Sequence, residues 1–441
     1  MTWLIIPALI LLALLGAPLF VILGGGALIA FALQGISSSA VLTEMSRLAT
    51  SPILLSIPMF TFAGYIFAES RMPERLVRLT RSLFGWIPGS LALVAMVACA
   101  IFTAFTGGSG VTIVAMGGLL MPALAKEGFS KKYSLGLMTT SGSLGFLFPP
   151  SLGLIIYSYV ASQSASGMAL PEGTAPEIDR LFLAGLLPGI FLIVVLSFLA
   201  FRQGRTVTVG APARLSFRAG LKDLLPALRS AAWEVPLPIV ILGGIYGGKL
   251  TVTEAATVTA LYALFVEVVI YRDIPWRKIP AIATESMTLV GAILIILGSA
   301  LGLTNFLIDA EVPMRILDWI RGFITSRFVF LLMLNLFLLI IGSLMEIFSA
   351  MIVVPLIVPI ALEYNVNLVH LGIIFMTNLE IGFLTPPFGL NLFISSFRFR
   401  RPVTEVYRAT LPFLVVLLLA LLIITYWPDM SLWLPRLYGN R

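Results

Sequence analysis

Two short clusters of glycine and small hydroxyl residues could do chemistry in this sequence. Residues 106–110 read TGGSG, and residues 342–346 read GSLME. Glycine permits tight backbone turns, while Ser and Thr supply hydroxyl oxygens. Inside a membrane protein, such a turn leaves backbone groups free to bind a ligand. Both clusters are therefore candidate binding sites.

A Gly-x-x-x-Pro-Pro motif follows each cluster inside a further apolar segment. Residues 145–150 read GFLFPP, and residues 382–387 read GFLTPP. Proline lacks a backbone N–H and clashes with the preceding turn, so a Pro-Pro pair beside glycine must unwind a helix locally. Only 12 residues separate Lys132 from Gly145, too few for a complete span, so we expect one helix broken near its middle. The predicted hinges are Pro149, Pro150, Pro386 and Pro387.

The two cluster-and-break units are copies of one another. A shift of 237 positions superimposes residues 140–150 on residues 377–387 with six identities in eleven positions, and it also places Pro122 on Pro359. Ahead of each cluster, a shift of 240 matches a Pro-x-Arg motif, which suggests a pair of amphipathic interfacial arm helices. The matched residues are Pro73, Arg75 and Arg81 with Pro313, Arg315 and Arg321.

The composition indicates where these elements lie. Of 441 residues, 59% are hydrophobic and 11% are charged, against roughly 25% charged in a soluble domain. Uncharged stretches that approach or exceed the roughly 20 residues needed to cross a bilayer cover residues 1–43, 48–68, 181–201, 286–308, 328–345 and 409–428. The first stretch has no basic residues ahead of it, so we interpret it as a span and not as a signal peptide. An all-α polytopic membrane protein is predicted.

The charges indicate the orientation of the chain. The 28 Lys and Arg residues against 21 Asp and Glu give a net charge of +7, and such an excess in a membrane protein marks cytoplasmic loops and not a nucleic-acid surface. Placing the basic loops in the cytoplasm predicts nine crossings, a cytoplasmic N-terminus and a periplasmic C-terminus. Residues 311–327 conflict with this path, because they fall outside yet contain Arg315, Arg321 and Arg327.

The same charges orient the repeats. Residues 82–125 form 44 consecutive uncharged residues between basic ends, which predicts a re-entrant helical hairpin, although the length also permits two full spans. Residues 328–362 repeat the pattern between two outside loops. The first broken helix runs from Lys132 outward and the second runs inward toward Arg398, so the units are antiparallel. Inverted repeats with paired broken helices indicate a secondary transporter with a site at the midplane.

Several motifs resemble the large membrane subunit of tripartite ATP-independent periplasmic (TRAP) transporters. They are residues 57–60 (IPMF), the tip before Pro122, the Gly-x-x-x-Pro-Pro break and, most specifically, residues 378–393 (NLEIGFLTPPFGLNLF). The resemblance covers nearly the whole chain. It implies an inverted-repeat elevator-type importer of the bacterial inner membrane, driven by sodium and carrying a C4-dicarboxylate or another carboxylate. It also implies two partners, a small four-helix membrane subunit and a periplasmic substrate-binding protein.

On this resemblance we expect two sodium sites, each joining a tip to its break. An unwound helix offers backbone carbonyls to a dehydrated ion without burying a net charge. The expected ligands are Thr106, Gly108, Ser109, Thr140, Gly142 and Gly145 in the first site, and Gly342, Ser343, Glu346, Asn378, Gly382 and Thr385 in the second. Glu346 departs from the family, which often has Asp there, and the TGGSG tip departs from its common Ser-Gly-Ser.

A carboxylate substrate is expected between the tips, facing helix N-termini whose free N–H groups favour an anion. The candidate substrate ligands are Ser109, Thr112, Ser141, Ser143, Ser343 and Asn391. No cofactor and no other metal are expected, since the chain has one Cys and one His. Glu346 and Glu380 are carboxylates in apolar runs, and whether they bind ion, substrate or neither stays open.

Other readings of these residues remain. Gly, Ser and Thr also serve close helix packing in membranes. A stand-alone sodium/dicarboxylate symporter of related inverted-repeat fold is the alternative function. An enzyme is not expected, because the sequence has no His-Glu-x-x-His, no Ser with a plausible His base and no phosphate loop.

The predicted organisation alternates scaffold and transport segments. Residues 1–86 hold N-terminal scaffold spans and the first arm helix, and residues 87–170 hold the first hairpin and broken helix. Residues 171–327 hold scaffold spans and the second arm helix, and residues 328–400 hold the second hairpin and broken helix. Residues 401–441 form a C-terminal scaffold span.

Overall fold

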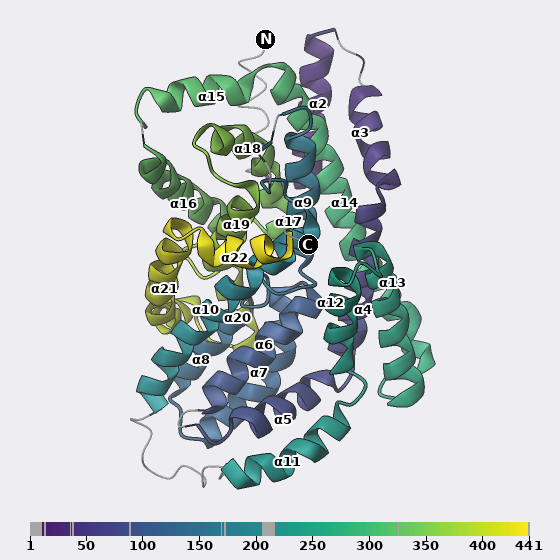
Figure 1. The fold of residues 1–441 in the computed structure, drawn as a ribbon, viewed down its shortest axis with the longest axis vertical. Helices are drawn as coiled ribbons and strands as arrows, with labels where there is room; N and C mark the ends of the chain where they lie inside the picture. The colour runs from purple at the N-terminus through teal and green to yellow at the C-terminus, as the bar shows by residue number, and fades with distance from the viewer. Residues whose placement is uncertain are drawn as a thin grey trace.

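The structure, a computed structural model, describes residues 11–12, 15–35, 37, 39–87, 90–168, 170–171, 173–204, 217–324 and 326–439. Parts of the predicted first span and of the longest basic loop lie outside these ranges. Throughout the described ranges, every regular element is helical. Figure 1 shows many of the helices running along the long axis of the molecule, while α5 and α15 lie across it at opposite ends.

Seven of the described helical segments are long and apolar enough to cross a membrane, by length and composition. They are Pro52–Glu69, Ser109–Lys126, Ile178–Arg202, Val252–Ile270, Trp276–Asp309, Arg327–Leu344 and Val403–Tyr426. Five of the six stretches expected from the sequence coincide with one of these. The number of crossings and the side on which each terminus lies stay predictions.

The uncharged stretch expected to hold the first span contains more than one helix. The structure has α2 (Leu19–Leu33) and then a separate α3 (Ser39–Thr50). Between them Gly35 adopts a positive φ of +71°, a conformation that glycine takes without steric cost. The uncharged run therefore contains a turn that hydropathy alone does not mark.

Beyond α2 and α3, the helices in the segments predicted as scaffold follow in chain order around the two units. They are α4 (Ser56–Glu69), α10 (Ile178–Gly204), α11 (Phe217–Ser230), α12 (Pro236–Tyr246), α13 (Val252–Phe265), α14 (Ile279–Asp309), α21 (Val403–Tyr426) and α22 (Asp429–Gly439). The arm helices are α5 (Met72–Phe84) and α15 (Val312–Arg321), and each has a proline in its first turn, where the missing N–H costs nothing.

Both glycine clusters form turns between helices. The first turn joins α6 (Ser90–Thr106) to α7 (Ser109–Lys126), with Gly107 at φ +66°. The second follows α16 (Arg327–Leu344), where Met345 and Glu346 are extended ahead of α17 (Ile347–Ala350) and α18 (Val354–Glu363). That these turns lie within the bilayer stays a prediction.

Both Pro-Pro motifs lie in breaks between helices, as predicted. Ten residues separate α8 (Lys131–Ser141) from α9 (Leu152–Ser164). Seven residues separate α19 (Leu368–Gly382) from α20 (Leu390–Phe399). The starts of α8 and α19 are capped by Ser130 and Asn367, whose side chains accept backbone N–H groups. These two caps also coincide under the shift of 237, so the repeat extends beyond the motifs.

The two units run in opposite directions. In Figure 1 the first unit passes upward from α8 to α9, and the second passes downward from α19 to α20. Phe146 and Phe383, which are equivalent under the shift of 237, pack edge to face with ring centroids 5.9 Å apart. Equivalent residues touch each other only close to the axis that relates the repeats. The axis therefore passes between the two breaks.

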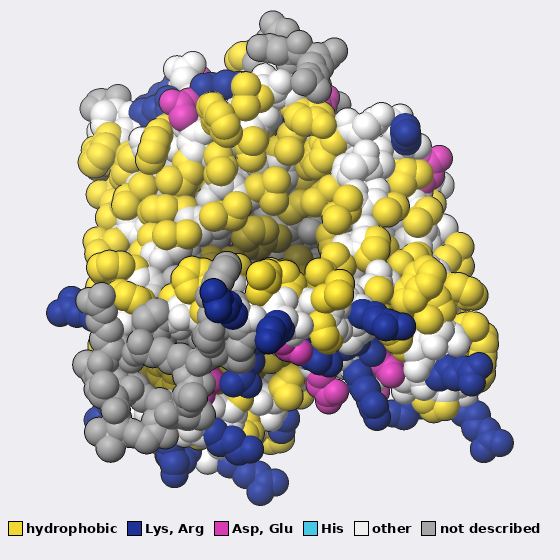
Figure 2. All heavy atoms as spheres, turned by 60° about the horizontal axis from the view of Figure 1, so that its bottom comes forward, with side chains coloured by type: hydrophobic (Ala, Val, Ile, Leu, Met, Phe, Trp, Pro, Cys, Tyr) yellow, Lys and Arg dark blue, Asp and Glu magenta, His cyan; other side chains and the backbone are white. Residues whose placement is uncertain are grey.

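The broken helices form the centre of the molecule. Every residue of α19 is buried, and α8 is buried from Tyr133 to Ser141. Tyr157 of α9 donates to the backbone oxygen of Leu368 at 2.8 Å, which joins the first unit to the second. On the outside, Figure 2 shows a broad band of hydrophobic side chains with Lys and Arg gathered below it. This pattern is typical of a membrane protein.

The C-terminal helix α22 was not anticipated. The ring of His370, at the start of α19, lies 3.1 Å from the Thr425 backbone oxygen and 3.2 Å from the Ser431 hydroxyl. His370 is fully buried. His370 therefore joins α19 to α21 through Thr425 and to α22 through Ser431.

Candidate functional site

The first tip and the first break are in direct contact. A β-carbon added at Gly145 would lie 2.6 Å from the backbone nitrogen of Ala104, on the last turns of α6. One at Gly142 would lie 3.2 Å from the backbone oxygen of Ser109. Real side chains do not fit at such distances. These two glycines therefore let the unwound chain approach the tip.

Thr103 joins the same elements and was missed by the sequence analysis. Its hydroxyl oxygen lies 2.9 Å from the Gly142 backbone oxygen and 2.7 Å from the Thr112 hydroxyl. The available signal was its position one turn before Thr106, on the same face of α6. Thr112 is thereby placed with the first site.

Two oxygens predicted for the first site, those of Thr106 and Thr140, and one predicted for the substrate, that of Ser141, are buried without a partner among the described residues. Burying a hydroxyl without a partner is unfavourable, and such groups are uncommon in native proteins. These oxygens are therefore free to accept a ligand.

Thr61 of α4 is a further buried hydroxyl without a partner. It lies one turn before Gly64, where a β-carbon would be 2.5 Å from the Phe105 backbone oxygen and 2.7 Å from the Cα atom of Thr106. The α4 helix therefore packs directly on the first tip. The sequence held a weak signal, since Thr61 follows the IPMF motif.

The second tip and break repeat this contact. A β-carbon at Gly382 would lie 2.5 Å from the carbonyl carbon of Gly342 and 2.9 Å from the backbone nitrogen of Ser343. The side-chain amide of Asn378 donates to the Oδ1 atom of Asn335 at 2.7 Å, and its own Oδ1 atom is buried without a partner. Asn335, which was not predicted, fixes this orientation.

Thr385, Ser343 and Glu346 were also predicted for the second site. No hydrogen bond joins their side chains to one another or to Asn378 among the described residues. The hydroxyls of Thr385 and Ser343 donate to Ile381 and Ile340 of their own helical turns, at 3.0 and 2.8 Å. Glu346 is exposed and makes no capping bond at α17. Glu380 is the contrasting carboxylate, because it is fully buried and neither of its oxygens has a partner.

The start of α9 lies between the two tips. A β-carbon at Gly107 would lie 2.5 Å from the Cδ1 atom of Leu152, and one at Gly153 would lie 3.4 Å from the Cγ2 atom of Ile347. Consecutive residues of α9 therefore touch the first and the second turn. The N-terminus of this helix favours negative charge nearby.

Asn391 brings the second unit to the first. Its amide donates to the backbone oxygen of Thr139 at 3.3 Å, while its Oδ1 atom is buried without a partner. The start of α7 is close by, since a β-carbon at Gly110 would lie 2.9 Å from Ile394. Together with the contact between Gly107 and Leu152, these contacts place the N-termini of α7, α9 and α20 in one region.

Ser143, the equivalent of Glu380 under the shift of 237, is buried, and its hydroxyl lies 3.4 Å from the Thr140 backbone oxygen.

The chain is similar to known membrane permeases over nearly its whole length. Residues 6–430 match the family described as "Tripartite ATP-independent periplasmic transporter, DctM component". A C4-dicarboxylate TRAP transporter large permease protein of Pseudomonas aeruginosa is 35% identical, over 88% of this chain and 87% of its own. The ectoine/5-hydroxyectoine large permease of Ruegeria pomeroyi is 30% identical over 98% of both chains.

Two further similarities bear on substrate and fold. The sialic acid TRAP transporter large permease of Vibrio cholerae is 30% identical, over 87% of this chain and 86% of its own. Among solved structures, the YdaH transporter of Alcanivorax borkumensis aligns with a TM-score of 0.62 at 14% identity, covering 90% of this chain and 88% of its own. This second likeness concerns the fold alone.

Proposed function

The chain belongs to the DctM family, the large permease component of TRAP transporters, and from this we propose that it imports an organic acid with sodium as the coupling ion. It is a multi-pass membrane permease and not an enzyme. The relatives are named for different substrates, namely a C4-dicarboxylate, isethionate, ectoines and sialic acid. Isethionate bears a sulfonate and the other molecules bear a carboxylate, so the proposed substrate class is organic acids, with a carboxylate as the expected acidic group.

One observation carries the proposal of sodium coupling. Near the first tip, three hydroxyl oxygens from α6 and α8 are buried without hydrogen-bond partners among the described residues, beside a break that only glycine permits. Neutral oxygens and backbone carbonyls suit a monovalent cation, because they coordinate it without adding a buried charge. The inverted second tip supplies the proposed mate, with the Oδ1 atom of Asn378 as a free oxygen.

The proposed substrate position is between the tips. Support comes from the N-termini of α7, α9 and α20, whose N–H groups and dipoles favour a carboxylate. The Asn391 oxygen accepts no hydrogen bond, so it could accept one from a hydroxyl of the substrate.

The proposed mechanism is an elevator motion in which residues 87–170 and 328–400 move as one body against the scaffold. Contacts between the units support this, since Tyr157 bonds to Leu368 and Asn391 bonds to Thr139. The arms α5 and α15 would carry the motion. In this proposal the N-terminus is cytoplasmic, the C-terminus is periplasmic, and the protein works in the inner membrane.

The family is tripartite, and we propose a small four-helix membrane subunit and a periplasmic binding protein as the other components. The test is uptake of labelled C4-dicarboxylates and other organic acids into proteoliposomes that hold this chain and its small subunit. The binding protein is added outside, with or without an inward sodium gradient. We expect uptake only when the binding protein and the inward sodium gradient are both present.

Two results would reject parts of the proposal. Uptake driven by a proton gradient without sodium would reject sodium coupling. Uptake that needs no binding protein would favour the stand-alone sodium/dicarboxylate symporter. Omitting the small subunit is the matched control for assembly, because it removes a partner and leaves the chain intact.

A further inference from the structure

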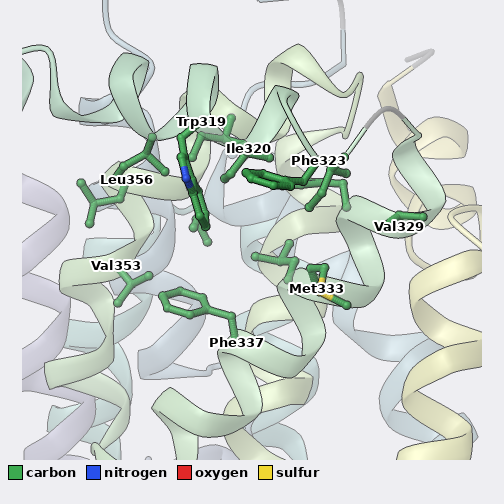
Figure 3. Close-up of a pocket in the computed structure, with 14 residues that line it drawn as sticks. Trp319, Ile320, Phe323, Val329, Met333, Phe337, Val353 and Leu356 are labelled. Atoms are coloured by element: carbon green, nitrogen blue, oxygen red, sulfur yellow. The ribbon is translucent and has the colours of Figure 1, made fainter.

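An apolar cavity of about 660 Å³ lies between α15, α16 and α18, and we call it the arm pocket. Every residue that lines it is hydrophobic. Figure 3 shows Trp319 from α15, Phe323 just after that helix, Phe337 from α16 and Leu356 from α18 around one space. Apart from the indole N–H of Trp319, water in such a space would find no hydrogen-bond partner in the side chains that line it. The lining therefore fits a hydrocarbon.

The corresponding place beside the first arm is closed by protein. The α11 helix lies along α5, and a β-carbon at Gly220 would be 2.8 Å from the backbone oxygen of Ser82. Arg78 pairs with Asp223 across this contact at 3.0 Å. The cavities left beside α5 have volumes of about 400 and 320 Å³, and charged side chains line them. In the part of the chain that the structure describes, α15 packs mainly on α14 and α18, and no helix covers it as α11 covers α5.

The arginines of the two arms differ in the same way. Arg75 in α5 is paired with three carboxylates. Its equivalent in α15, Arg315, is exposed and makes no ion pair with any described residue. Arg327, the first residue of α16, is likewise exposed without an ion pair among the described residues. Two guanidinium groups are therefore free for an outside anion.

Both free arginines are close in sequence to residues that line the arm pocket. Arg315 lies one helical turn before Trp319, and Arg327 lies one turn before Phe330. A guanidinium group pairs well with a phosphate, which it can contact through two N–H groups. Charge and apolar volume together match a molecule with a phosphate at the end of a hydrocarbon chain.

We propose that the arm pocket binds one phospholipid, whose acyl chain fills the cavity and whose phosphate pairs with Arg315 and Arg327. A partner helix fits less well, since a helix about 10 Å wide would fill 660 Å³ with only about one and a half turns. In this proposal the lipid covers α15 as the α11 helix covers α5. This site also accounts for Arg315 and Arg327, two of the three arginines in residues 311–327 that the orientation of the other loops leaves unexplained.

The test is a titration of the purified, delipidated full-length chain in detergent with phosphatidylglycerol, followed by native mass spectrometry. One lipid should be retained per chain. Met333→Trp, which fills the cavity, should abolish retention. Leu336→Trp is the matched control, because Leu336 is an exposed residue of the same helix outside the lining.

The phosphate contact is tested separately. Arg315→Gln should weaken binding about fivefold, the effect of one basic residue near a lipid phosphate. Arg277→Gln, at an exposed arginine remote from the arm pocket, should leave binding unchanged. Because Arg315 makes no ion pair with the described residues, its replacement should leave the fold intact even if Met333→Trp does not fold.

Four outcomes would overturn the proposal. Equal binding of a diacylglycerol would remove the phosphate contact, and equal binding of inorganic phosphate would remove the acyl chain. Full retention of lipid by Met333→Trp would place the lipid elsewhere. A photoreactive side chain at position 337 that crosslinks to protein instead of lipid in native membranes would assign the pocket to a partner helix.

Discussion

The two arm helices, α5 and α15, occupy equivalent places in the repeat but have different surroundings. The α5 helix is bound by protein on both sides, with Arg75 inside a cluster of carboxylates. The α15 helix borders an apolar cavity, and its Arg315 makes no ion pair among the described residues. A repeated Pro-x-Arg motif therefore specifies a helix and its place, while the surroundings of the arginine depend on which other segments reach it.

Similar ion pairs nevertheless connect the arms to the hairpins. Arg81 pairs with Glu127 at 3.4 Å, and Arg321 pairs with Glu363. Each pair joins the end of an arm to the end of its hairpin. All four side chains are at least partly exposed, so each pair contributes only about 0–1 kcal/mol. These two ion pairs follow the symmetry of the repeat. The pairing of Arg75 with three carboxylates has no counterpart at Arg315 among the described residues.

The cluster around Arg75 is compact. Its Nε, Nη2 and Nη1 atoms donate to Glu234, Glu267 and Asp273 at 2.7, 2.8 and 2.7 Å. Its guanidinium carbon lies 4.0 Å from the centre of the Tyr271 ring. One Arg faces three carboxylates, and burial raises the pKa of Glu234 even though Arg75 acts in the opposite direction.

The largest difference between the arms should appear when each arginine is removed. Arg75→Met leaves three carboxylates with no counter-ion, so we expect a loss of about 3–5 kcal/mol in stability. Arg315→Met should cost less than about 0.5 kcal/mol. Thermal unfolding of both variants in the same detergent measures this. Similar losses in the two variants would contradict the comparison.

The breaks should respond alike, because the repeat is preserved there. A β-carbon at Gly145 or Gly382 would press on the backbone of its tip, so we expect each alanine variant to lose about 1–3 kcal/mol and to lose uptake. Gly291→Ala is the control, since its β-carbon would meet nothing within 4 Å. Thermal unfolding and uptake in proteoliposomes are the measurements. Normal uptake by either break variant would refute the role given to close approach.

Equivalent threonines at the two breaks sharpen the comparison of the sites. The Thr140 hydroxyl has no partner, whereas the Thr377 hydroxyl donates to the Ile373 backbone oxygen at 2.7 Å. If Thr140 binds sodium, Thr140→Val should raise the sodium concentration for half-maximal uptake about tenfold, the loss of one charge-assisted contact. Its stability without sodium should not fall. Thr377→Val should lose some stability and keep its sodium dependence, and the reverse pattern would reject this site.

The smallest effect expected is a pH dependence confined to the first arm. A carboxyl whose pKa is raised in the folded state binds more protons folded than unfolded, so its contribution to stability is complete below its unfolded value near 4.5 and is lost as pH rises through the folded value. Glu234→Gln should remove this part of the slope. Unfolding temperatures from pH 4 to 8 test it, and an unchanged slope would show that Glu234 does not hold the proton.

Much of the fold could be predicted because its signals are local. Hydropathy identified the membrane class, and Pro-Pro beside glycine identified both breaks, since these residues act on the backbone within one turn. The glycine clusters marked the turns, and the repeated spacing marked the two units. Hydropathy did not mark the turn at Gly35 in the N-terminal stretch, because that turn lies in a run without charges.

The candidate site was predicted only in part. Glycines of the tips and breaks are in contact as expected, but Thr61, Thr103 and Asn335 were missed. Each is a common residue in an apolar helix, and its importance comes from the helix that it faces. The predicted side-chain oxygens also differ in hydrogen bonding. The Thr140 hydroxyl has no partner among the described residues, whereas the Thr385 hydroxyl donates to the Ile381 backbone oxygen of its own helical turn.

The sequence by itself determined the membrane class, the inverted units, the turns and the family. Tertiary structure alone decided which polar atoms are buried without partners, which carboxylates surround Arg75 and where α15 borders a cavity. The partners of Arg75 are 159 to 198 residues away in the chain. Burial and ion pairing depend on such distant contacts, whereas hydropathy, proline and glycine act within a few residues of where they stand.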